Sequence, residues 1–203
     1  MCIQLRGRIT VQQLGWGILL TVMSCSTPGD RDGAKDSSTA APAKEASSHT
    51  TTNAESAART FVQDFYAWYA PLATKGTHGP AWYTVLDQRP GVLSDTLLHA
   101  LRDDRDAQAK AVGEIVGLDF DPFLAAQDPC ERYVVGDTVQ AGRTYRVSLF
   151  GVCGATRHSK ADVVAEVVRR DTSWVFVDFH YPGGDGGHLL GILSSTSSTK
   201  PSK

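Results

Sequence analysis

The spacing of apolar residues changes once along this chain, near Cys130, and this change constrains the fold more than any other feature. Before Cys130, apolar residues recur every three or four positions, as they do on helices with one buried face. After Cys130 they alternate with polar residues, which is typical of half-buried strands. Helices followed by a run of strands predict an α+β domain, in which the N-terminal helices cover one face of a four-stranded antiparallel meander.

The first expected helix begins at a capping box formed by residues 52–55 and ends near Pro71. Its apolar face carries Phe61, Phe65, Trp68, Tyr69 and Leu72. A stripe of this kind is more typical of a core than of a binding site. Trp68 and Tyr69 nevertheless carry polar groups that need hydrogen-bond partners, which keeps both as binding candidates.

Two more helices are expected before the strands begin. A short one covers residues 81–86, and a longer one follows the N-cap Ser94. The inward residues of the longer helix are Leu97, Leu98, Leu101 and Val112. Its charged run, residues 102–106, is predicted to be a solvated face with local ion pairs.

Four strands are expected after Cys130, at residues 132–135, 144–152, 162–169 and 174–181. Strict alternation in the last strand places Trp174, Phe176, Asp178 and His180 on one face. The apolar segment 189–193 must then pack on the domain. Residues 194–203 are predicted to be a disordered tail.

The segment 117–130, between the helices and the strands, combines acidic and amide side chains with large apolar ones. Asp121 followed by Pro122 predicts one or two helical turns over residues 122–127, with Asp121 as the N-cap and Pro129 ending them. Asp119, Asp121, Gln127 and Asp128 are candidate binding residues. Capping and other hydrogen bonds that specify the fold would explain them equally well. Asp119 has no capping assignment and is the better candidate for a surface or pocket function.

Residues 1–24 have the features of an export signal: Arg6 and Arg8, then a short apolar segment over residues 15–23. That segment is shorter than the ~20 apolar residues of a comfortable membrane span. Residues 22–25 resemble the lipobox of bacterial lipoproteins, which implies cleavage before Cys25 and attachment of acyl chains such as palmitate to it. Ser26 resembles the pattern that directs lipoproteins to the outer membrane, facing the periplasm. The alternative is a plain secretory signal in which Cys25 occurs by chance.

The segment from the predicted lipidated Cys25 to residue 52 is expected to be a flexible linker. It has no large hydrophobic residue and therefore cannot offset the entropy lost on ordering. The globular domain is then residues 53–193, a usual size for one domain. Removal of residues 1–24, which contain two Arg and no acid, changes the net charge from −2 to −4. This balance, with scattered basic residues, argues against a nucleic-acid groove.

The chain has 4 cysteines, of which Cys2 would leave with the signal and Cys25 would carry the lipid. Cys130 and Cys153 remain, and an oxidising compartment favours a disulfide between them. Such a bond would contribute about 3 kcal/mol in the chain-entropy model. Two free buried thiols and a metal-binding pair are the alternatives. The metal pair is disfavoured because no histidine or further cysteine stands at ligand spacing beside either residue.

Four stretches appear in an order that carries a family resemblance: residues 65–69, 118–124, 127–128 and 174–181. They resemble the bacterial "domain of unknown function 3828" family, which includes YbjP-type envelope lipoproteins. The resemblance covers residues 56–193. It implies a nuclear transport factor 2-like, cystatin-like cone, in which a strongly curved sheet wraps around helices, and an envelope location. It implies no established activity.

The sequence contains no nucleophile elbow, no phosphate-binding loop and no complete catalytic set, and it predicts no cofactor and no metal. It favours a non-catalytic binding or assembly domain for an envelope protein partner, anchored to the membrane through Cys25. The candidate binding surface also includes Tyr181. A small-ligand carrier is the alternative and would need a pocket of about 300 Å³ or more beside Asp119 and His180. A third possibility is a pocket enzyme that uses Asp178 and His180 as an acid–base pair.

Overall fold

The structure, a computed structural model, describes residues 45–76, 79–111, 113, 116–183 and 187–198. The predicted signal peptide, Cys25, the first part of the predicted linker, Val112 and the end of the predicted tail lie outside the described residues. In the part of the chain that is described, none of the helices is both long and apolar enough to cross a membrane.

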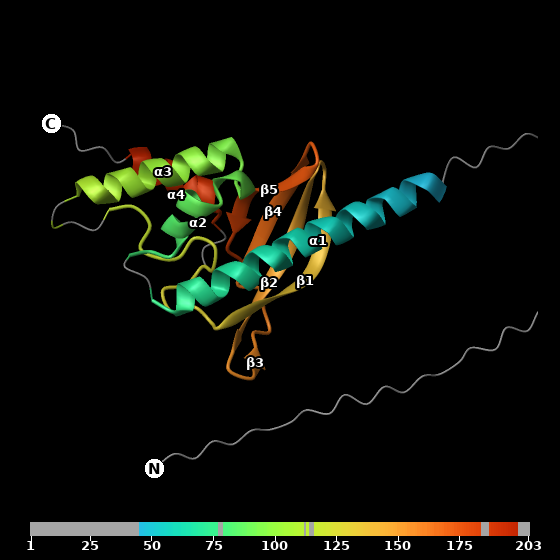
Figure 1. The fold of residues 1–203 in the computed structure, drawn as a ribbon, viewed down its shortest axis with the longest axis horizontal. Coiled ribbons are helices and arrows are strands. Elements are labelled where there is room, and N and C mark those ends of the chain that lie inside the picture. Colours follow the sequence, from blue (N-terminus) through green and yellow to red (C-terminus); the bar gives the residue numbers. More distant parts are fainter. Residues whose placement is uncertain (1–44, 77–78, 112, 114–115, 184–186, 199–203) are drawn as a thin grey trace, which may run out of the picture. The chain divides into compact units, whose positions relative to one another are not determined.

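Helices and a five-stranded antiparallel sheet form an α+β domain, as predicted (Figure 1). In chain order the elements are α1 (Glu45–Thr74), α2 (Trp82–Gln88), the 3-10 helix η1 (Pro90–Val92), α3 (Asp95–Lys110), β1 (Arg132–Ala141), β2 (Thr144–Cys153), β3 (Thr156–Arg157), β4 (Val163–Arg170), β5 (Ser173–His180) and α4 (Leu189–Ser198). The four predicted strands are β1, β2, β4 and β5, and the fifth, β3, is two residues long.

The sheet is an open meander with the strand order β1-β2-β4-β5, and β3 pairs with β2. Helix α1 lies along the sheet and contacts β1, β2 and β4, while α3 and α4 lie against each other near β5 (Figure 1). The sequence predicted that the first strand would end at Val135, before Gly136. It instead continues to Ala141 through a register shift between Val135 and Thr138. Gly136 allows the shift because the ring of Phe150 occupies the space that a Cβ would need.

The core lies between α1 and the sheet, and Phe65 is near its centre. Its ring contacts the rings of Phe123 and Phe176 at centroid distances of 5.6 and 4.8 Å. Phe65 and Tyr69 are buried, whereas Phe61 and Trp68 are partly buried. The predicted aromatic stripe of α1 is therefore mainly a core face.

Helix α1 is longer at both ends than the sequence predicted. It begins at Glu45, so residues 45–52 of the predicted linker are helical rather than irregular. Extending an existing helix adds one hydrogen bond for each residue fixed, which does not require large apolar side chains. At the other end α1 passes Pro71, and its last turn is held by a 3.1 Å hydrogen bond from the Thr74 hydroxyl to the Ala70 carbonyl. Helix α4 likewise extends to Ser198, into the predicted tail.

Helix α3 begins as predicted, with Ser94 Oγ accepting a hydrogen bond from Leu97 N at 3.3 Å. The prediction of a wholly solvated charged run is wrong at one position, because Asp104 is buried. Its carboxylate accepts hydrogen bonds from Gln108 Nε2 at 2.7 Å and from Leu118 N at 3.3 Å. Burial raises the pKa of Asp104, and the two hydrogen bonds oppose that rise. Through its hydrogen bond to Leu118 N, Asp104 thus links α3 to the segment that precedes β1.

Strand β5 does not alternate strictly, and this corrects the predicted face. The register of β4 and β5 shifts where Glu166 pairs with Asp178 and Val167 pairs with Phe176, which leaves one extra residue on β5. Phe176 and Phe179 therefore both point into the core, with stacked rings 5.0 Å apart. Asp178 and His180 share a face, as expected, but Phe176 is not on it.

Candidate functional site

The segment between α3 and β1 contains a single compact turn at its centre, where the sequence predicted one or two helical turns over residues 122–127. Asp121 N donates to the Ala126 carbonyl at 2.9 Å, and these two residues form an isolated bridge. Ala125 has a positive φ of 52°, which reverses the chain before a second helical turn forms. The capping role of Asp121 is nevertheless present. Its Oδ1 accepts hydrogen bonds from Phe123 N at 2.9 Å and Leu124 N at 3.1 Å.

Three tyrosine hydroxyls hold this turn in place. Tyr66 donates to the Phe123 carbonyl at 2.6 Å, Tyr181 donates to the Pro122 carbonyl at 2.8 Å, and Tyr69 donates to Asp121 Oδ2. Tyr69 and Tyr181 were both predicted as binding candidates, and the structure shows that their hydroxyl groups hold this turn.

The Asp121 carboxyl group has an unusual charge environment. Burial raises its pKa to about 6, although the hydrogen bonds from Tyr69, Phe123 and Leu124 favour the ionised form. Burial and the neighbouring Asp121 charge also raise the pKa of Tyr69 well above its ordinary value. Asp121 is therefore a satisfied group that shapes the turn, and its remaining capacity to bind a ligand is small.

A pocket of about 590 Å³ lies beside the turn, and we call it the motif pocket. Its apolar walls include Trp82, Leu118 and Phe120, and its polar lining includes Asp119 and Gln127. Gln127 Nε2 donates to the backbone carbonyl of Asp119 at 3.2 Å, which links the two polar positions. Within the described part of the chain, no donor contacts the exposed Asp119 carboxylate. Three of the predicted binding residues, Asp119, Asp121 and Gln127, thus line one pocket.

Two other predicted binding residues, Trp68 and Asp128, do not line the motif pocket. The partly buried ring of Trp68 has the Arg89 guanidinium above it, 4.0 Å from the ring centroid. Asp128 is exposed and does not line the pocket. Neither residue adds a group to the motif pocket.

Asp178 and His180 do not form the acid–base pair considered from the sequence. Asp178 Oδ2 lies 2.5 Å from His188 Nδ1, and its Oδ1 accepts a hydrogen bond from Leu190 N at 3.1 Å at the start of α4. His180 Nε2 instead lies 2.7 Å from Glu166 Oε2. No pattern in the sequence indicated these partners, because Glu166 reaches His180 only through the pairing of β4 with β5. His188 reaches Asp178 only through the turn after β5.

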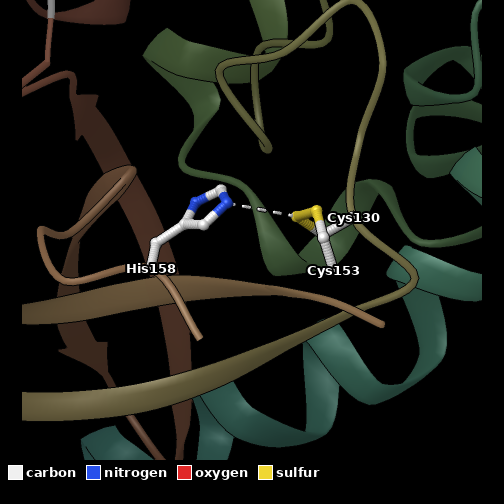
Figure 2. Close-up of side chains that lie close together, drawn as sticks. All are labelled: Cys130, Cys153 and His158. Carbon is white, nitrogen blue, oxygen red and sulfur yellow. Dashed lines mark hydrogen bonds between the residues drawn. A yellow bond between two sulfur atoms is a disulfide. The ribbon is translucent and has the colours of Figure 1, made fainter. Parts of the chain in front are cut away.

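A second group of side chains surrounds the disulfide between Cys130 and Cys153, whose Cα atoms are 4.7 Å apart (Figure 2). His158, from the loop between β3 and β4, directs Nε2 toward Cys130 Sγ at 3.7 Å. Its Nδ1 lies 2.8 Å from Asp162 Oδ1, and Asp162 Oδ2 accepts a hydrogen bond from Gly151 N at 2.6 Å. We call Cys130, Cys153, His158 and Asp162 the sulfur–histidine cluster.

Gly151 on β2 makes room for this cluster. A Cβ at this position would lie 2.9 Å from Cys130 Sγ and 3.2 Å from both His158 Nδ1 and Asp162 Oδ2. Any larger residue would therefore force the cluster apart.

The sulfur–histidine cluster corrects one argument made from the sequence. Ligand atoms of Cys130, Cys153 and His158 all lie within 4.8 Å of one another, so the fold supplies the histidine that sequence spacing did not show. The two sulfur atoms are joined in the disulfide, and they consequently offer no thiolate to a metal ion.

A pocket of about 600 Å³ adjoins the cluster, and we call it the histidine pocket. Its lining includes His158, Lys160, Asp162 and Tyr181. Phe120 lines both this pocket and the motif pocket. The two cavities therefore share one aromatic side chain.

No protein-family model matches the sequence, and no curated protein matches it. Among solved structures, the chain is similar to a protein of unknown function from Bacteroides thetaiotaomicron VPI-5482, whose crystal structure was determined at 2.10 Å resolution. The two share 21% sequence identity over 66% of this chain and 97% of that chain, with a TM-score of 0.48. Membership of the "domain of unknown function 3828" family stays a prediction from the sequence.

Proposed function

We propose that this chain is a lipid-anchored cell-envelope protein whose domain binds a protein partner through the motif pocket without catalysing a reaction. The observation that supports this most directly is the contrast between two neighbouring carboxylates. Asp121 is occupied by three donors of its own domain, whereas the exposed Asp119 on the same pocket has none among the described residues. A carboxylate that no described donor contacts, beside an apolar cavity, is a usual arrangement for a binding site.

The lining of the motif pocket supports a proposal for the chemistry of the partner. Phe120, which is partly exposed, offers aromatic surface, and Asp119 supplies a negative charge beside it, whereas Trp82 in the pocket wall is buried. A segment that carries a lysine or arginine next to an apolar side chain would match both features. We therefore place a basic, partly apolar segment of an envelope protein in this pocket.

Replacing Asp119 with asparagine is expected to weaken partner capture about tenfold, since one partly desolvated ion pair is worth about 1.4 kcal/mol. The fold should keep its stability because the Asp119 side chain holds no other described residue. Capture is measured by placing a photo-crosslinking amino acid at Gln127 in intact cells and quantifying the crosslinked partner by mass spectrometry.

Asp128→Asn is the matched control, because it removes an exposed carboxylate of the same segment that does not line the pocket. A second control places the crosslinker at Val139, which is 61% exposed and belongs to β1. Equal capture by the Asp119→Asn and unsubstituted chains, or equal capture from Val139 and Gln127, would contradict the proposed surface.

The membrane anchor is supported by the lipobox-like residues 22–25 alone. Replacing Cys25 with serine is expected to abolish labelling by a fatty-acid analogue and to release the protein from membrane fractions, since the thiol that carries the diacylglycerol is lost. Cys2→Ser, which changes a cysteine inside the predicted signal, should leave labelling unchanged. Persistent labelling of the Cys25→Ser chain would show that the anchor is wrongly assigned.

A small-ligand carrier is the second candidate, and the volume of the motif pocket favours it. About 590 Å³ lies within the range of small-molecule sites, which is roughly 300–1,000 Å³. The pocket lies beside Asp119, as the carrier hypothesis required, but not beside His180. Native mass spectrometry of the purified chain separates the two candidates. A carrier would show a bound small molecule that Asp119→Asn releases, and a protein-binding domain would not.

A further inference from the structure

The two cysteines of the disulfide in the sulfur–histidine cluster differ in their exposure to solvent. Cys130 is buried, with a relative exposure of 4%, whereas Cys153 is exposed. An external thiolate can therefore approach the disulfide from the Cys153 side. Which sulfur is attacked determines which one departs, and attack at Cys153 makes Cys130 the leaving group.

His158 is placed beside the departing sulfur, with Nε2 3.7 Å from Cys130 Sγ (Figure 2). Its other ring nitrogen lies 2.8 Å from Asp162 Oδ1, which fixes the orientation of the ring. Asp162 is in turn held by Gly151 N. A cysteine beside a protonated histidine forms a thiolate more readily, and a better thiolate leaves faster from a disulfide.

We propose that the Cys130–Cys153 disulfide is a thiol–disulfide exchange site that oxidises a dithiol, with His158 as the residue that stabilises the Cys130 thiolate. This exchange would take place at the sulfur–histidine cluster and not at the motif pocket, where no reaction is proposed. The exposure of Cys153 leaves room for the incoming dithiol on the side of the disulfide away from Cys130.

The exchange balances in two steps. A thiolate of the dithiol attacks Cys153 Sγ and forms a mixed disulfide, while the Cys130–Cys153 bond breaks and its electron pair leaves with Cys130 Sγ. His158, protonated from the solvent, pairs with that thiolate. The second thiol of the dithiol, as its thiolate, then attacks the dithiol's first sulfur, which is bonded to Cys153 in the mixed disulfide. This forms the new disulfide within the dithiol and releases Cys153. The dithiol is oxidised to a disulfide by two electrons, and the chain is left with two reduced cysteines.

The test is reduction of the folded, full-length chain by dithiothreitol at pH 7, with acid quenching and alkylation. Mass spectrometry of the peptides that contain Cys130 and Cys153 excludes any signal from Cys2 and Cys25. His158→Gln is expected to slow the reduction about tenfold, because the leaving thiolate loses the imidazole that lies beside it. His99→Gln is the matched control: His99 also faces a carboxylate, Asp103 at 3.5 Å, but it lies on α3 rather than beside a sulfur.

A second measurement separates stabilisation of the thiolate from general loosening of the fold. In the Cys153→Ser chain, the rate of Cys130 alkylation is followed against pH. We expect its midpoint to lie below the ordinary thiol value of about 8.5, and His158→Gln in the same background should return it to that value. Asp162→Asn, which keeps an acceptor for Gly151 N, should give an intermediate midpoint.

Three results would overturn the proposal: reduction of His158→Gln at the unsubstituted rate, a Cys130 midpoint at or above the ordinary thiol value of about 8.5, or a disulfide that dithiothreitol reduces only after the domain has been unfolded. The last would identify the bond as purely structural.

Discussion

Replacing Phe123 with alanine is expected to destabilise the domain by about 3–5 kcal/mol, the range for deleting a fully buried aromatic ring. Phe123 is 0% exposed, and its ring contacts Phe65, Tyr69 and Phe179 at centroid distances of 5.6, 5.3 and 5.1 Å. The side chain joins the turn to α1 and β5, so a cavity here removes contacts on both sides of the core. Urea unfolding followed by circular dichroism measures the loss.

Phe120→Ala is the matched control for this experiment. Phe120 belongs to the same segment, but it is partly exposed, and its ring packs edge-on against that of Tyr181 at a centroid distance of 5.5 Å. Its replacement should cost clearly less than that of Phe123. Equal losses for the two variants would mean that Phe123 is not the residue that anchors the turn.

Asp121→Asn is expected to change how stability depends on pH. The pKa of Asp121 is about 6 in the folded domain and near 4 in an unfolded chain, so the folded state binds the proton more tightly. The stabilisation from that proton is complete below pH ~4 and is lost as pH rises through about 6. The unsubstituted domain should therefore lose about 3 kcal/mol between roughly pH 4 and pH 7. The Asp121→Asn variant should not show this loss, because its side-chain amide cannot ionise.

The measurement is the difference in unfolding free energy between the two chains at several pH values. Other groups with raised pKa values, such as Asp104, are present in both chains and cancel. Asparagine keeps an oxygen for Phe123 N and Leu124 N and an amide group that can donate to the Tyr69 oxygen. Parallel pH profiles for the two chains would show that the Asp121 carboxyl group is not desolvated.

The sequence predicted the order of helices and strands correctly because both patterns depend on local spacing. Leu97 and Leu101 recur at helical intervals and are buried, and Val163, Ala165 and Val167 alternate as a half-buried strand does. The features that the sequence could not predict depend on pairing between distant segments of the chain. The bulge on β5, which separates Phe176 from the face of Asp178, exists only in the register of β5 against β4.

The candidate sites likewise divide into features set by local sequence and features set by contacts between distant segments. Asp119 and Gln127 were identified from a segment that is unusually rich in both polar and apolar groups, and they do line one pocket. Of the one or two helical turns expected after Asp121, only a single capped turn forms, because Asp121–Pro122 fits either length and local propensity does not decide between them. His158 was missed because its distance from Cys130 is set by the path of the chain through β2 and β3. No spacing in the sequence contains that information.

The three tyrosine bonds to the turn also bear on the order in which this chain folds. They join positions 57, 52 and 59 residues apart, so each requires a long loop to close before it can form. The turn should therefore close late, after α1 and the end of β5 have come together. Once closed, it cannot open without breaking contacts on both. A segment with no regular secondary structure thus belongs to the same cooperative unit as the core helix and the sheet.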